Sequence, residues 1–119
     1  GESLRWERVH ALADFVYFNH SVHVNHGVGC ASCHGPVDQM PLMYQHGTLL
    51  MQWCLDCHRD PAPNLRPADR IYDVEWTWDT DPAADDPEHK GPGTRGRELM
   101  SEFHIQPTDK LTDCWTCHR

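Results

Sequence analysis

The sequence predicts a mainly irregular fold with short α-helices and one short N-terminal strand, and two observations lead to this. Only 39% of the 119 residues are hydrophobic, and 8 glycines and 9 prolines interrupt the chain, so a large apolar core is not expected. Six cysteines and ten histidines are many for this length, and such counts are typical of small domains held together by covalent links or metal centres. The length suits one domain, which we place at residues 1–119.

Charge and hydropathy narrow the classes of function. The chain has 18 acidic residues against 10 Lys and Arg, a net charge of −8, which argues against binding to nucleic acid or to an anionic membrane surface. No apolar run approaches the roughly 20 residues that a membrane-spanning helix needs. A basic partner, or none, fits this charge better than an acidic one.

The six cysteines form three pairs, and a histidine follows each pair directly. The three C-x-x-C-H strings are Cys30, Cys33 and His34; Cys54, Cys57 and His58; and Cys114, Cys117 and His118. This string is the attachment signature of c-type haem, in which two thiols form thioethers with the porphyrin and the adjacent imidazole binds the iron. The sequence therefore predicts three covalently bound haem c groups, with these cysteines as attachment points and these histidines as iron ligands.

Paired cysteines also occur in zinc sites and in disulfide frameworks. The first two pairs alone have the spacing of a four-cysteine zinc ribbon. In this composition a histidine follows a given pair by chance in about 8% of cases, so three such coincidences have a chance of about 6 in 10,000. A disulfide framework gives no reason for tight pairs that each precede a histidine. Haem attachment explains the pattern better than either alternative.

The residues before the first motif predict a short extended element and contain a cluster of histidines. Phe15–Phe18 is aromatic and β-favouring, and we expect it to form the short strand. His20, His23 and His26 recur at every third position, so on a helical turn they would lie on roughly one face. Because three irons each need a second axial ligand, we expect at least two of these histidines to bind iron.

The remaining chain is expected to be loop-rich. The segment Met40–Arg59 is apolar and leads into the second motif as a helix or a turn, and a short helix is expected at residues 97–104. Between them, an acidic and proline-rich loop is expected at about residues 60–95, with Trp76 and Trp78 extended and one or both rings against a haem. With about 40 residues for each haem, we expect the haems themselves to form the core.

The motifs resemble those of two cytochrome families. Phe18–Val24, together with the motif at residues 30–34, is similar to the F-x-H-x-x-H lead and first haem motif of the trihaem class III cytochromes. A closer resemblance is to the C-terminal part of the pentahaem cytochrome subunit of alternative complex III, a quinol-oxidising membrane assembly. The similar strings lie at residues 6–10, 14–20, 39–42, 53–59 and 112–114. This chain has three motifs rather than five, so it is either a free trihaem relative or a domain of a larger subunit.

The resemblance to the trihaem family implies the distal iron ligands. It pairs His20 with the haem of the first motif and His23 with the haem of the second. The third distal ligand in that family lies four residues before the second motif, where this chain has Leu50. A methionine in the similar strings of the alternative complex III subunit favours Met51. The candidates for the third haem are therefore Met51, His46 and His104.

Full axial ligation predicts the class of function. Iron with two strong axial ligands has no open position for a small-molecule substrate, so we expect an electron-transfer carrier or relay rather than an enzyme. The resemblance implies a quinol-oxidising respiratory chain, with other redox proteins or membrane oxidoreductase subunits as partners. The alternative is a multihaem reductase with one open haem site for an anion such as nitrite, which the acidic charge disfavours.

The resemblance also implies a compartment. Thioether attachment takes place outside the cytoplasm in both families, so we expect a periplasmic protein or one on the outer face of the inner membrane. We also expect its precursor to carry a signal peptide or an N-terminal anchor.

Overall fold

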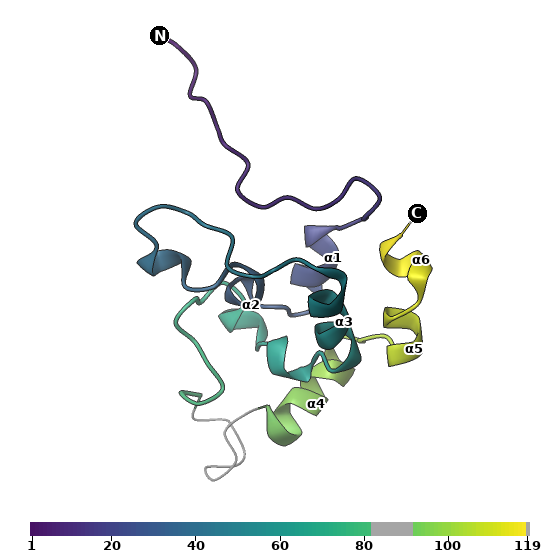
Figure 1. The fold of residues 1–119 in the computed structure, drawn as a ribbon. Coiled ribbons are helices and arrows are strands. Elements are labelled where there is room, and N and C mark those ends of the chain that lie inside the picture. Colours follow the sequence, from purple (N-terminus) through teal and green to yellow (C-terminus); the bar gives the residue numbers. More distant parts are fainter. Residues whose placement is uncertain (82–91, 119) are drawn as a thin grey trace.

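Short helices joined by irregular segments make up the structure, a computed structural model that describes residues 1–81 and 92–118 (Figure 1). The α-helices in these ranges are α1 (His20–Asn25), α2 (Cys30–His34), α3 (Met51–Arg59), α4 (Gly93–Glu102), α5 (Thr108–Leu111) and α6 (Cys114–Cys117). Single 3-10 turns are η1 (Val37–Gln39), η2 (Ala62–Asn64) and η3 (Ala68–Arg70). The expectation of a mainly irregular fold with short helices is confirmed.

No helix in the described ranges has both the length and the apolar character to cross a membrane. The longest of them, α4, has 10 residues.

The prediction of a strand at Phe15–Phe18 is wrong. In this segment Val16 forms a single antiparallel bridge with His118, and the Tyr17 N–H donates to the Cys117 carbonyl at 2.7 Å. A strand needs a partner of several extended residues, and α6 occupies the chain up to Cys117, so extended pairing is limited to this point. Within the part of the chain that the structure describes, β-pairing consists of isolated bridges.

Two helices differ in extent from the expectation. In the segment Met40–Arg59 only the last nine residues, α3, form an α-helix, and Leu49 just before it has a positive φ of 55° that no helix continues through. The helix expected at residues 97–104 begins earlier, at Gly93, and ends at Glu102. His104 also has a positive φ of 53°, so it lies outside α4.

A small apolar cluster packs the middle of the chain against α4. Leu65, Trp76, Trp78 and Leu99 are buried together, and Leu65 and Leu99 are fully inaccessible. The indole rings of Trp76 and Trp78 meet edge to face with centroids 4.9 Å apart, and the Trp78 indole N–H donates to the Pro63 carbonyl at 3.1 Å. Both tryptophans therefore contribute to a protein core.

The expected loop at about residues 60–95 is irregular where the structure describes it. Residues 60–81 contain η2 and η3, and α4 begins within the expected loop at Gly93. The part of the acidic tract at residues 82–91 lies outside the described residues.

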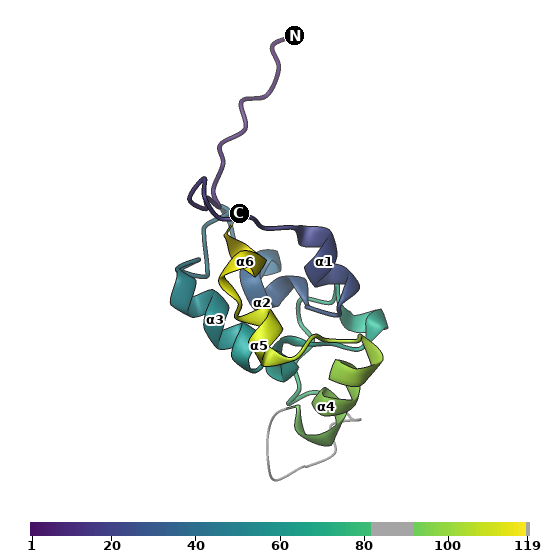
Figure 2. The same ribbon diagram turned by 90° about the vertical axis from the view of Figure 1, so that its right-hand side faces the viewer.

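The packing of the helices brings α6 close to the segment that leads into α1. Helix α4 packs on η2 and α5 packs on α3. In both views the first residues run away from the helices as an extended arm, whereas α6 lies close to the segment that leads into α1 (Figures 1 and 2).

Candidate functional site

Each C-x-x-C-H motif lies on a short helix. The first motif forms α2, the second forms the end of α3, and the third forms α6 with His118 directly after it. Residues at positions i, i+3 and i+4 lie on one face of a helix, so in α2 and α3 the two cysteines and the histidine of the motif point to one side. This arrangement suits a flat group that is held by two thiols and one imidazole.

Side-chain caps mark the start of α1 and of α6. The Asn19 side chain accepts a hydrogen bond from the Ser21 N–H at 2.9 Å and caps α1. In the same way Asp113 accepts from the Trp115 N–H at 3.0 Å and caps α6. Both are residue types that favour this position because their short side chains reach the free amides of the first turn.

Helix α1 places one imidazole opposite each of the first two motif histidines. The rings of His20 and His34 are nearly parallel, with an interplanar angle of 9° and centroids 6.2 Å apart. The rings of His23 and His58 are also 6.2 Å apart, at 31°. Metal–imidazole bonds of about 2 Å on opposite sides of one metal ion put the two ring centres about 6 Å apart. Both pairs therefore fit two axial ligands of one iron.

Backbone carbonyls orient the second pair of imidazoles. Nδ1 of His23 lies 2.9 Å from the Asn19 carbonyl, and Nδ1 of His58 lies 2.8 Å from the Leu111 carbonyl. A carbonyl can only accept, so Nδ1 is the donor in both bonds, and Nε2 is the nitrogen left to bind a metal. This is the orientation that metal-binding histidines usually have.

Burial favours the neutral form of the His23 and His34 imidazoles. Burial is the main cause that lowers the pKa of His23, although the hydrogen bond to Asn19 opposes it. Burial also lowers the pKa of His34, with additional repulsion from His10 and His20. A neutral imidazole is the form that binds a metal, so these surroundings favour ligation.

The cysteines of different motifs lie near one another. Burial raises the pKa of the Cys33 thiol to about 11, and the nearby thiols of Cys57, Cys54 and Cys30 add to the rise. Burial also raises the pKa of Cys54, and Cys117 of the third motif adds to it. The second motif therefore lies between the other two.

Hydrogen bonds also join the three motifs. The Asn64 side chain donates to Cys57 Sγ at 3.5 Å, while the Asn64 carbonyl accepts from the Ser32 hydroxyl at 3.4 Å. This residue links the first motif to the second. The bond from His58 to Leu111 of α5 links the second motif to the segment that carries the third.

The three candidates for the third distal ligand lie in different places. His46 packs against Gly35, directly after the first motif. His104 is exposed after the end of α4. Met51 is the first residue of α3 and its exposed fraction is 60%.

The third motif histidine faces a different neighbour from the other two. Its ring lies 5.8 Å from the Phe15 ring, and its Nδ1 lies 3.4 Å from the Phe15 carbonyl. Phe15, Cys114, Trp115 and His118 line an open hollow at this end of the molecule. The aromatic segment that was expected to form a strand thus contacts the third motif instead.

His10 is a residue of the site that the sequence did not indicate. Its ring meets the ring of His34 edge to face with centroids 4.6 Å apart. Its Nε2 is buried without a hydrogen-bond partner among the described residues. A buried nitrogen of this kind usually has a partner, so its position beside His34 fits a site that receives a further polar or metal-bearing group. No spacing links residue 10 to a motif, so only the fold could place it here.

In the described ranges, no three side chains of His, Cys, Asp or Glu converge where they could hold a metal ion among themselves. Comparison with known proteins finds no family model and no curated protein that matches the chain.

The contact between Gly35 and His46 gives a testable prediction. Gly35 has a φ of 69°, and a Cβ there would lie 2.5 Å from His46 Cγ. We expect Gly35→Ala to lower the free energy of unfolding by about 2–4 kcal/mol, as strain and overpacking add up. Denaturant unfolding followed by tryptophan fluorescence measures this.

Gly93 provides the matched control. Its φ is also positive, at 45°, but a Cβ there meets nothing within 4 Å. Gly93→Ala should cost only about 1–2 kcal/mol. Adding His46→Ala to Gly35→Ala should recover part of the loss. Equal losses for the two alanine variants would contradict the packing of His46 on Gly35.

Proposed function

We propose that the chain is a trihaem c-type cytochrome domain that transfers electrons between redox partners. The observation that carries this proposal is the pair of facing imidazoles, 6.2 Å apart, at each of the first two C-x-x-C-H motifs. Attachment motifs alone leave the second axial position of each iron undefined. The facing rings supply a suitable second ligand for two of the three haems.

The proposal gives each residue of the motifs a role. Cys30 and Cys33, Cys54 and Cys57, and Cys114 and Cys117 would form the thioethers, and His34, His58 and His118 would bind iron on one side. His20 and His23 would bind the first and second irons on the other side. Haem bound in this way exchanges single electrons by outer-sphere transfer, without a bond to substrate.

The links between the motifs support a relay rather than three independent centres. Asn64 joins the first motif to the second, and the thiols of Cys54 and Cys117 lie close enough to interact. Groups attached at these cysteines would lie near one another. Electrons could then pass along the chain of motifs, from the first through the second to the third or in reverse.

Met51 is the distal ligand that we propose for the third haem. It precedes Cys54 by three residues on α3, so the two side chains lie on one face of that helix. Cys54 is also the cysteine of the second motif that interacts with Cys117. His46 packs on Gly35 beside the first motif, so we rank it lower, and we place His104 after it.

The partners in this proposal are other redox proteins or subunits of a membrane oxidoreductase, and the compartment is the periplasm or the outer face of the inner membrane. The net charge of −8 favours a partner with a basic surface around its own redox centre. The resemblance to the alternative complex III subunit favours a place in a quinol-oxidising chain.

Covalent stoichiometry is the experiment that tests the proposal. All six cysteines occur in C-x-x-C-H pairs, so the denatured protein should retain three haems per chain. Mass spectrometry and the absorbance of the pyridine haemochrome measure this number. Two haems or fewer would refute the assignment of all three motifs.

Replacing either His20 or His23 of α1 should free one axial position on one haem iron. His20→Ala and His23→Ala should each convert one haem to a high-spin form that binds carbon monoxide, because each removes one axial ligand. His26→Ala is the control, since the His26 Nδ1 is held by the Val22 carbonyl at 2.6 Å and its ring faces no motif histidine among the described residues. Absorption spectra with and without carbon monoxide distinguish the variants. A high-spin signal in His26→Ala alone would move the ligand assignment to that residue.

A thioether ligand at the third haem should leave its own spectral mark. If Met51 binds that iron, the oxidised protein should have a weak sulfur-to-iron charge-transfer band in the near infrared, and one haem should have a higher potential than the other two. Met51→His should abolish the band and lower that potential. Absence of the band from the unmodified protein would pass the role to His46 or His104.

A further inference from the structure

Arg66 is a buried cation that lies against the start of the first motif. Its exposed fraction is 8%, and its backbone N–H donates to the Gly27 carbonyl at 2.8 Å. Its side chain is packed so tightly on Gly29, the residue before Cys30, that a Cβ at that glycine would collide with it. The guanidinium carbon lies 5.2 Å from the centroid of the Trp76 ring. The charge is therefore held at one place beside Cys30.

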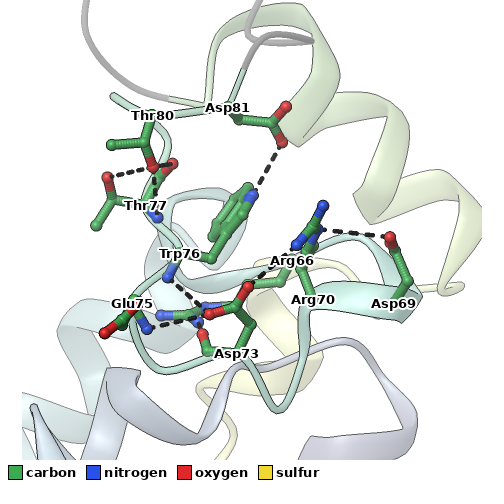
Figure 3. A network of polar contacts seen from close by, with 9 residues as sticks. All are labelled: Arg66, Asp69, Arg70, Asp73, Glu75, Trp76, Thr77, Thr80 and Asp81. Carbon is green, nitrogen blue, oxygen red and sulfur yellow. Dashed lines mark hydrogen bonds and ion pairs between the residues drawn. The ribbon is translucent and has the colours of Figure 1, made fainter.

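The charge of Arg66 is only partly compensated. One guanidinium N–H donates to the backbone carbonyl of Asp73, as Figure 3 shows, and this acceptor carries no net charge. The Asp73 carboxylate is used elsewhere: it pairs with Arg70 at 3.1 Å and accepts from the amides of Glu75 and Trp76 at 3.2 Å each. In residues 1–81 and 92–118, no carboxylate forms a close ion pair with Arg66.

Arg66 stays charged at any working pH. Burial lowers the pKa of the guanidinium, whereas Asp73 and Cys30 act in the opposite direction. Arginine starts from so high a pKa that it is not deprotonated in proteins. The cation is thus a fixed feature of the first motif.

The second motif has a negatively charged neighbour, whereas the first has the cation of Arg66. Burial is the main cause that raises the pKa of the Cys57 thiol; the hydrogen bond from Asn64 opposes it, and the charges of Cys54 and then Asp60 add to the rise. Cys57 is thus close to an anion, whereas Cys30 is close to a cation. Both motifs have a facing imidazole pair, so the type of axial ligand is the same at both.

A fixed cation favours the state of a nearby redox centre that has gained an electron. Reduction adds one negative charge, and attraction to a buried cation is weakly screened by water or salt. Charge and burial around a haem are among the factors that set its potential.

We propose that Arg66 raises the reduction potential of the haem at Cys30, Cys33 and His34 above that of the haem at Cys54, Cys57 and His58. Electrons that reach the second haem then move on to the first. The inference rests on the proposed function, because it needs haem at both motifs. It assigns a direction to electron transfer between the first two haems, each of which has two proposed histidine ligands.

The test compares two arginines of the same network. Arg66→Met removes the buried charge and keeps an unbranched apolar side chain, whereas Arg70→Met removes the same charge from a side chain with an exposed fraction of 49%. Spectroelectrochemical titration of the trihaem protein gives the potentials. The first haem is identified as the one whose titration moves in His20→Met, since a thioether ligand raises the potential.

We expect Arg66→Met to lower the equilibrium constant for reduction of the first haem about tenfold, which is about 59 mV for a one-electron couple. Arg70→Met should change it by less than about twofold, because solvent screens that charge. Both variants should keep three low-spin haems. A trihaem Arg66→Met protein with an unchanged first potential would overturn the inference and leave the proposed function intact. A protein that binds no covalent haem would overturn both.

A second variant decides the matter if Arg66→Met does not mature. Asp73→Asn keeps an oxygen for the amides of Glu75 and Trp76 but removes the carboxylate that acts most strongly on Arg66. The first haem should then become easier to reduce, while the second and third stay unchanged. No upward shift in this variant would overturn the inference.

Discussion

The short helix α1 is the constraint on which the rest of the candidate site depends, because it presents two imidazoles to two different helices. His20 and His23, one turn apart, face His34 of α2 and His58 of α3. Six residues are too few for a helix to be stable alone, so the Asn19 cap is important to its geometry. After it the chain turns sharply at Gly27, which has a φ of 80° and leaves no room for a Cβ beneath the Phe103 ring. α4 thus helps to hold the connection between α1 and the first motif.

Much of the site could be predicted from local patterns. The C-x-x-C-H spacing is itself a helical spacing, and all three motifs lie on or directly beside helices. The three-residue interval of His20 and His23 places them on one face only if the segment is helical, and α1 is a helix there. These features depend on residues within a few positions of each other, where backbone geometry alone decides which side chains share a face.

The features that the sequence did not predict depend on contacts between distant segments. His10 reaches His34 across the fold, and Arg66 lies beside Gly29 because residues 64–73 run along the first motif. Arg66 lies in no motif, and the string at residues 6–10 that contains His10 assigns no role to this histidine. The expected strand failed for the same reason, since β-propensity at Phe15–Phe18 has no effect without a partner strand, and the chain near His118 offers one bridging residue. β-propensity is a property of one segment, whereas strand pairing depends on two segments.

The contact between Phe15 and His118 has a consequence for how the molecule assembles. It joins residues that are 103 positions apart, whereas the bond that orients His23 joins residues four positions apart. Loop-closure entropy makes the longer contact costlier to form by about 3 kcal/mol in an otherwise unfolded chain. The first two motifs can therefore organise around α1 while the last motif is still free, and the last becomes fixed only when the intervening chain has already shortened the loop. We therefore expect the contact between Phe15 and His118 to form late in folding.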